Sequence, residues 1–138
     1  MLETIRLICD SGLLVLIWIV QLIIYPSFSY YKHEDLHKWH TIYTKRIAIV
    51  VIPLMTTQLV VSLIQIYLDL SYLSLLYLVM VLLAWISTFL IFVPLHDNIS
   101  KKKAIEQSIK KLKLHNWLRT ILWSFIFILT CYIETTLL

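Results

Sequence analysis

The sequence YLSLLYLVMVLLAWISTFLIFVPL, residues 72–95, decides the fold, because it contains no charged side chain over its whole length. As an α-helix, a run of this length spans a hydrocarbon core of about 30 Å at about 1.5 Å per residue. Only helices and closed barrels satisfy every backbone hydrogen bond inside lipid, and this run lacks the alternation of a barrel strand. The stretch therefore predicts a transmembrane helix.

Three other apolar runs of similar length occur along the chain, in which 60% of the residues are hydrophobic and only 14% are charged. An average soluble domain is about 25% charged, and a small domain buries too little surface to hide so many apolar side chains. We expect a single transmembrane domain over residues 1–138, folded as an all-α, antiparallel four-helix membrane bundle. Its predicted helices span about 5–28, 35–68, 72–95 and 116–138.

The cationic residues predict the orientation of this bundle. Eleven of the twelve Lys and Arg residues lie in the connections 29–46 and 96–116 or at Arg119, and the remaining one is Arg6. The positive-inside rule then places both connections in the cytoplasm and both termini outside, in a multi-pass protein of the cell (inner) membrane. Because these cations adjoin apolar runs, the net charge of +4 does not indicate binding to nucleic acid.

The second long connection has an amphipathic pattern between about residues 100 and 114. Ile105, Ile109 and Leu112 recur at i, i+4 and i+7, which predicts a helix that lies on the membrane surface. Lysines on such a helix attract anionic lipid by about 1 kcal/mol each; the alternative is that they serve topology and solubility alone. These lysines are Lys101, Lys102, Lys103, Lys110, Lys111 and Lys113.

All five histidines lie in or beside the two basic connections, where four helix ends meet. Imidazoles that converge there can bind a transition metal, and two of them can flank a haem. The alternative is that they are surface or hydrogen-bonding histidines without a ligand. The candidate metal ligands are His37, His40, His96 and His115.

Polar residues inside apolar spans are costly in lipid and therefore informative. Gln21, Gln58 and Gln65 are expected either to form interhelical hydrogen bonds or to line a small polar pocket. We expect Asp10 to lie close enough to water on the outer side to need no partner. The cysteines, Cys9 and Cys131, fit no metal or redox spacing and are interpreted as small apolar packing residues.

Arg119 opens the fourth span, where the positive end of the helix dipole does not favour a cation. Three roles remain open for it. It can extend to lipid phosphate, it can pair with Asp97, or it can clamp an anionic or carbonyl-bearing substrate.

The chain also carries a set of short motifs: Tyr25-Pro26, His40 with Tyr43, Pro53, Ser87-Thr88, Val93-Pro94-Leu95-His96 and Asn116-Trp117-Leu118-Arg119-Thr120. Together they resemble small four-helix bacterial membrane proteins of unknown function and, more distantly, the anthrone-oxygenase-like family. That resemblance implies oxidation of an aromatic substrate by O₂, with His96, Asn116 and Arg119 at the pocket. The family usually carries Asn where this chain has His96.

These observations lead to a functional hypothesis. The chain is expected to be a small membrane oxidoreductase or a metal- or haem-binding enzyme, acting at the cytoplasmic face on a lipid-soluble substrate such as a quinone, polyketide or lipid. The predicted catalytic residues are His96, Asn116 and Arg119, with Tyr43 as a proton relay. The competing hypothesis is a non-catalytic subunit of a larger membrane complex or homo-oligomer. A transporter is disfavoured, because four helices offer little room.

Overall fold

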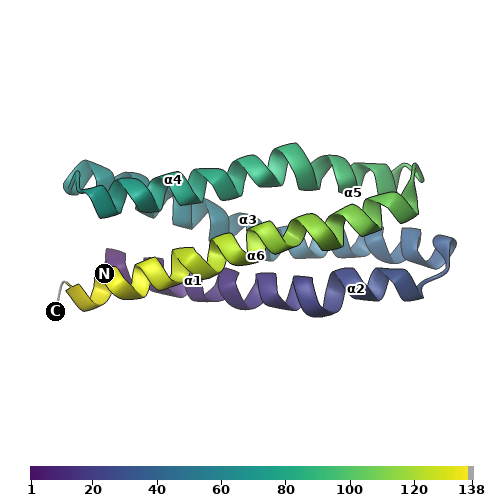
Figure 1. Ribbon diagram of the computed structural model, residues 1–138, viewed down its shortest axis with the longest axis horizontal. Coiled ribbons are helices and arrows are strands. Elements are labelled where there is room, and N and C mark those ends of the chain that lie inside the picture. Colours follow the sequence, from purple (N-terminus) through teal and green to yellow (C-terminus); the bar gives the residue numbers. More distant parts are fainter. Residues whose placement is uncertain (137–138) are drawn as a thin grey trace.

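The computed structural model describes residues 1–136 as four long, antiparallel helical columns (Figure 1). Met1 and the described end of α6 (Ile105–Thr136) lie at the same end of the bundle (Figure 1). The predicted all-α four-helix bundle is confirmed, while residues 137–138, predicted to end the fourth helix, lie outside the described residues. In chain order the elements are α1 (Leu2–Ile19), η1 (Val20–Ile24), α2 (Tyr25–Ser27), η2 (Phe28–Tyr30), α3 (His33–Leu68), α4 (Tyr72–Ser87), η3 (Thr88–Phe92), α5 (Val93–Ser100) and α6 (Ile105–Thr136).

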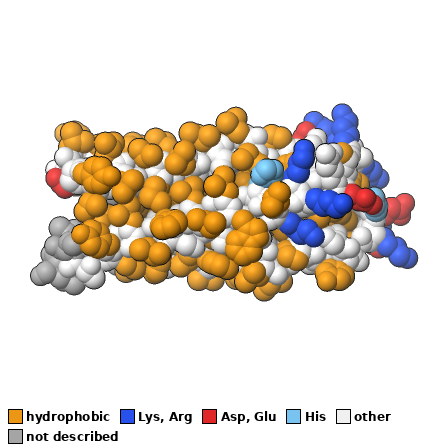
Figure 2. Space-filling view, in the orientation of Figure 1, with side chains coloured by type: hydrophobic (Ala, Val, Ile, Leu, Met, Phe, Trp, Pro, Cys, Tyr) orange, Lys and Arg blue, Asp and Glu red, His pale blue; other side chains and the backbone are white. Residues whose placement is uncertain are grey.

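The four columns are each long and apolar enough to cross a membrane, which makes the chain a multi-pass membrane protein. Figure 2 shows hydrophobic side chains along the length of the bundle and most Lys, Arg and His side chains gathered at one end. We call this end the basic end. The opposite end, which holds Met1, the described end of α6 and the short link between α3 and α4, is called the terminal end (Figure 1).

The fourth column differs from the predicted helix at about 116–138, because it also includes most of the segment predicted to lie on the membrane surface. The segment 100–114 is not a separate helix on the membrane surface, because α6 begins at Ile105 and continues without a break to Thr136. Ile109 and Leu112 are buried in the protein core rather than facing lipid. The apolar stripe is therefore used for packing, since the neighbouring columns also extend beyond the apolar region at the basic end.

Two columns contain a π-helical turn just before a proline. The turn Val20–Ile24 precedes Pro26, and the turn Thr88–Phe92 precedes Pro94. Proline has no backbone N–H to donate, and wide turns of this kind relieve the local loss of a hydrogen bond. Such turns are frequent at functional sites. Here they lie in columns that contribute neighbouring side chains to the basic half of the bundle.

Candidate functional site

A chain of hydrogen bonds joins three of the four columns in the basic half. The Tyr25 hydroxyl lies 3.1 Å from His96 Nε2, and His96 Nδ1 lies 2.8 Å from His40 Nε2. Tyr25 follows the first π-helical turn, His96 follows the second, and His40 comes from α3. We call this chain the Tyr25–His96–His40 relay. Tyr25 and His40 are buried, at 2% and 0% exposure.

The relay continues toward water at the basic end. His40 Nδ1 lies 3.4 Å from Ser100 Oγ, a weak contact, and Ser100 is exposed at the end of α5. His37 Nε2 lies 3.0 Å from the backbone oxygen of Ser100. Of the predicted histidines, the structure thus brings His40 and His96 together and places His37 at the solvent end of the same chain.

The other end of the relay borders a cavity of about 250 Å³. Tyr25, Tyr43 and His96 line it near the basic end, and side chains of all four columns form its apolar walls. Two of its lining residues, Ile52 on α3 and Phe89 on η3, are both 57% exposed on the bundle surface. The cavity therefore opens sideways between these columns toward the region that lipid would occupy.

Arg119 lines this cavity and is only 8% exposed. Its guanidinium carbon lies 4.2 Å from the centre of the Phe92 ring and 4.8 Å from the centre of the Trp123 ring. Asp97 instead pairs with Lys101, at 2.7 Å. The expected pairing with Asp97 is wrong, and so is the extension to lipid phosphate, because the arginine is packed between aromatic rings inside the bundle.

Three N–H groups on residues that line the cavity have no hydrogen-bond partner among the described residues. They are the Nε–H group of Arg119, the indole Nε1–H group of Trp85 and the indole Nε1–H group of Trp123. Buried N–H groups are nearly always paired, so groups left unpaired in a native structure call for an explanation. All three are donors. A ligand with acceptor oxygens would match this set better than a cation or an alkane.

Asn116, predicted as a catalytic residue at the pocket, lies instead beside Gln21 between α6 and η1. Its amide nitrogen donates to Gln21 Oε1 at 2.9 Å, and the Gln21 amide nitrogen donates to the backbone oxygen of Lys113 at 3.3 Å. Asn116 is fully buried and ties α6 to the π-helical turn η1, and it is absent from the described cavity lining. It therefore positions Tyr25, which directly follows that turn.

The predicted three-histidine metal site is not found. Within residues 1–136, no group of three or more His, Cys, Asp or Glu side chains is placed to hold a metal ion. His115 is only partly buried on α6, one residue before the inward-facing Asn116. Because successive helix residues point about 100° apart, the two side chains leave the helix in different directions. Both ring nitrogens of His96 are already hydrogen-bonded.

Sequence reasoning missed two parts of the site. The sequence marks Tyr25 only as part of the Tyr25-Pro26 motif, although this residue forms one end of the relay. Trp85 and Trp123 gave no sequence signal, because aromatic residues are ordinary in membrane spans. Comparisons with family models, with curated proteins and with solved structures found no match to this chain.

Proposed function

We propose that this protein is a small membrane enzyme that binds a lipid-soluble carbonyl compound, such as a quinone, and exchanges protons with its oxygen through the Tyr25–His96–His40 relay. The observation that carries the proposal is the continuous chain of contacts from the cavity to Ser100 at the surface. The sideways opening beside Ile52 and Phe89 supplies a route for a substrate that dissolves in lipid.

The relay has two consistent arrangements of its protons. In one, the Tyr25 hydroxyl donates to His96 Nε2, His96 Nδ1–H donates to His40 Nε2, and His40 Nδ1–H faces Ser100. In the other, Ser100 donates to His40 Nδ1, His40 Nε2–H donates to His96 Nδ1, and His96 Nε2–H donates to the Tyr25 oxygen. The Tyr25 O–H is then free to donate into the cavity. Passing one proton along the chain converts one arrangement into the other, because each imidazole accepts at one nitrogen and releases at the other.

Arg119 supplies the electrostatic part of the mechanism. When a carbonyl oxygen gains electron density, its developing negative charge is stabilised by a nearby fixed cation in a site that excludes water. Arg119 borders the cavity together with Tyr25. In an oxidoreductase reaction, a quinone takes two electrons from an external reductant and two protons, and the relay delivers one proton per passage.

A binding experiment tests the first half of the proposal. The full chain, reconstituted in lipid nanodiscs, is titrated with a benzoquinone that carries a decyl tail, and tryptophan fluorescence is recorded. We expect saturable quenching and a lowered carbonyl stretching frequency for the bound quinone, because the cavity presents unpaired donors. Decylbenzene, which lacks the oxygens, should compete weakly. Equal competition by decylbenzene would contradict a site that recognises carbonyl oxygens.

Matched variants locate the binding site. Ala48 lines the cavity, so Ala48→Phe should fill it and abolish saturable binding. Val79 is 45% exposed on the outside of α4, so Val79→Phe adds the same side chain without entering the cavity and should bind normally. Unchanged binding by Ala48→Phe would show that the probe binds elsewhere.

Proton delivery is tested by reducing the bound quinone at an electrode while a pH-indicator dye records proton uptake. His96→Phe interrupts the relay and should slow proton uptake while leaving quinone affinity nearly unchanged. Equal uptake rates would remove the relay from the mechanism. Absence of quinone binding, together with a second membrane protein copurifying in stoichiometric amount, would favour the role of a non-catalytic subunit.

We also propose that the basic end faces the cytoplasm and contacts anionic lipid. The basis is the charge distribution in Figure 2 and the exposure of five of the six connection lysines, since only Lys113 is half-buried, with its Nζ donating to Ser29 Oγ at 3.0 Å. Accessibility of cysteines introduced at the two ends of the bundle to a membrane-impermeant reagent tests this orientation.

A further inference from the structure

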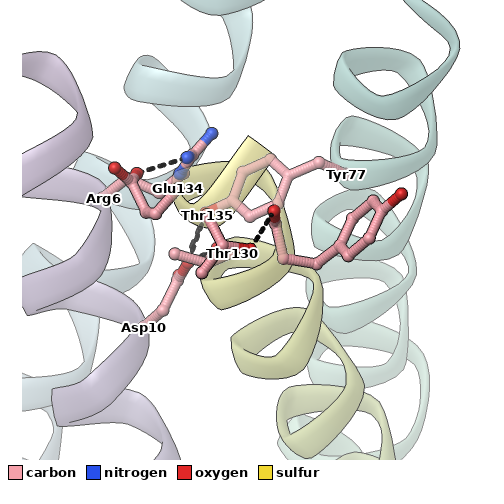
Figure 3. A network of polar contacts seen from close by, with 7 residues as sticks. Arg6, Asp10, Tyr77, Thr130, Glu134 and Thr135 are labelled. Carbon is pink, nitrogen blue, oxygen red and sulfur yellow. Dashed lines mark hydrogen bonds and ion pairs between the residues drawn. The ribbon is translucent and has the colours of Figure 1, made fainter. Parts of the chain in front are cut away.

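Asp10 occupies a second polar site, in the terminal half of the bundle. The expectation that it lies near water without a partner is wrong, because its side chain is completely buried. Its carboxylate accepts hydrogen bonds from Gln58 Nε2 at 2.6 Å, from Thr130 Oγ1 at 2.5 Å and from the Tyr77 hydroxyl at 3.0 Å. Figure 3 shows Asp10, Tyr77 and Thr130 turned toward one another.

The partners of Asp10 come from every other column. Gln58 lies on α3, Tyr77 on α4 and Thr130 on α6, while Asp10 itself lies on α1. We call these four residues the Asp10 hub. A purely structural role would require only that the carboxylate connect the helices. Its charge requires a further explanation: three neutral donors favour the ionised carboxylate, whereas complete burial disfavours a charge there.

The charges around the hub do not balance. Arg6 on α1 forms an ion pair with Glu134 on α6, 2.5 Å between Nη2 and Oε1. Among the described residues, the other titratable side chains near the carboxylate are Cys9 on α1 and Tyr77 on α4, both of which are neutral in their ordinary form. In the described part of α3, the contact to Asp10 comes from the uncharged Gln58. One cation therefore faces two carboxylates, and binding one proton removes the excess negative charge.

Gln58 provides independent support for a bound proton. It is completely buried, and its Oε1 atom has no hydrogen-bond partner among residues 1–136. A protonated Asp10 would carry an O–H group that needs an acceptor. Rotation of the Gln58 amide brings the unpaired oxygen to that O–H, so the same side chain can donate to the ionised carboxylate and accept from the protonated one.

Polar side chains of α3 lie between the hub and the terminal end, and the Ser62 hydroxyl among them donates to the backbone oxygen of Leu59 at 2.7 Å. A cavity of about 400 Å³ at that end is lined in part by Arg6, Gln65 and Ser74. One face of α3 carries polar residues at i, i+4 and i+7, which are Gln58, Ser62 and Gln65. This face leads inward from the cavity, at Gln65, to Asp10, which Gln58 contacts. Ser62 is fully buried and Gln65 Oε1 is unpartnered in the part of the chain that the structure describes.

We propose that Asp10 is a proton-binding site that loads from the terminal face along the Gln65–Ser62–Gln58 face of α3. A hydronium ion in the cavity gives up one proton, breaking its O–H bond and leaving water, and a new O–H bond forms on one Asp10 oxygen. The Gln58 amide then rotates so that its Oε1 atom accepts a hydrogen bond from that O–H group. This site is separate from the Tyr25–His96–His40 relay. The protein then has one proton-binding group connected to each end of the bundle, with the substrate cavity between them.

Infrared spectroscopy of the full chain in nanodiscs tests the proposal directly. The chain contains four aspartates, and Asp35, Asp69 and Asp97 are exposed. With ¹³C-labelled aspartate carboxyls, we expect the wild type at neutral pH to show one protonated carboxyl band and three ionised ones. Absence of a protonated aspartate band would overturn the proposal and leave the hub as a structural connection only.

Variants assign the band and the path. Asp10→Asn should remove the protonated band, while Asp97→Asn, at an exposed position, should keep it. Should Asp10→Asn not fold, Tyr77→Phe makes the assignment, because loss of that hydroxyl raises the band frequency whereas Tyr72→Phe, on the exposed surface, leaves it unchanged. A protonated band that persists in Asp10→Asn, or is unmoved by Tyr77→Phe, would contradict the assignment.

Gln65→Leu should slow exchange of the Asp10 proton for deuterium several-fold, while His96→Phe should not affect it. The opposite pattern would place proton entry at the basic end and overturn the proposed route. Neither measurement involves a ligand in the substrate cavity, so failure of this inference is distinguishable from failure of the proposed function.

Discussion

The two polar clusters of this bundle differ in whether their residues reach a cavity or the surface. We call the Asp10 hub closed because none of its four residues is exposed and none is among the residues that line the two cavities, although Gln58 Oε1 is still unpaired among the described residues. The Tyr25–His96–His40 relay is open at both ends, to a cavity on one side and to Ser100 on the other. The closed cluster holds the helices in register, and the open cluster has capacity left for a ligand.

The largest effect is expected for Asp10→Ala. Three buried donors lose their acceptor, and at roughly 1–2 kcal/mol for each donor the free energy of unfolding should fall by about 3–6 kcal/mol. Denaturation in mixed detergent micelles measures this loss. The control is Asp97→Ala, which removes an exposed acid and should cost at most about 0.5 kcal/mol. Equal losses in the two variants would show that the hub contributes no special stability.

Arg119→Leu should have the next largest effect, and it should act on binding. A hydrogen bond from a charged group contributes about 1.5–3 kcal/mol, so quinone affinity should fall by roughly tenfold to a hundredfold. Stability should not fall, because the variant removes a buried cation that has no acidic partner within residues 1–136. Arg119→Lys retains the charge and should bind with intermediate affinity. A large loss of stability in Arg119→Leu would assign the arginine to structure instead.

His96→Phe tests the open cluster in the same way as Asp10→Ala tests the closed one. The Tyr25 hydroxyl and His40 each lose a partner, which at about 1 kcal/mol for each hydrogen bond gives a loss of about 1–2 kcal/mol in unfolding free energy. The loss is smaller than at Asp10 because these groups border a cavity or lead to solvent. His115→Phe should change stability by less than about 0.5 kcal/mol, as is usual at surface positions away from special contacts. Equal destabilisation by the two variants would contradict this contrast.

Lys101→Ala should have the smallest effect. The Lys101–Asp97 pair is exposed and spans one helical turn, so it should contribute no more than about 0.5 kcal/mol, and less at high salt. Thermal unfolding in detergent at low and high salt measures it. A salt-independent loss above about 1 kcal/mol would mean that exposed pairs at the basic end stabilise the bundle more than is usual for such pairs.

The sequence predicted the relay better than the hub. Histidines near the basic helix ends indicated that imidazoles would meet, and His40 and His96 do meet. The predicted metal site with His115 is not found within residues 1–136. The His115 side chain leaves α6 about 100° away from that of the neighbouring, inward-facing Asn116. Asp10 carries a signal for the hub, because a charged residue inside an apolar span is costly in lipid. Its place near the outer end of the span predicts access to water instead, and the structure shows that this prediction is wrong.

The amino-acid sequence by itself determined four spanning helices and the segregation of charge to one end. The reason is that lipid leaves a chain few ways to satisfy its backbone, so long apolar runs become helices whatever their neighbours are. Only the tertiary structure decided which polar side chains meet. Asp10 contacts Gln58, Tyr77 and Thr130 across 48, 67 and 120 residues of sequence. Such meetings depend on the rotation of each helix about its axis, which the packing of all four columns sets together.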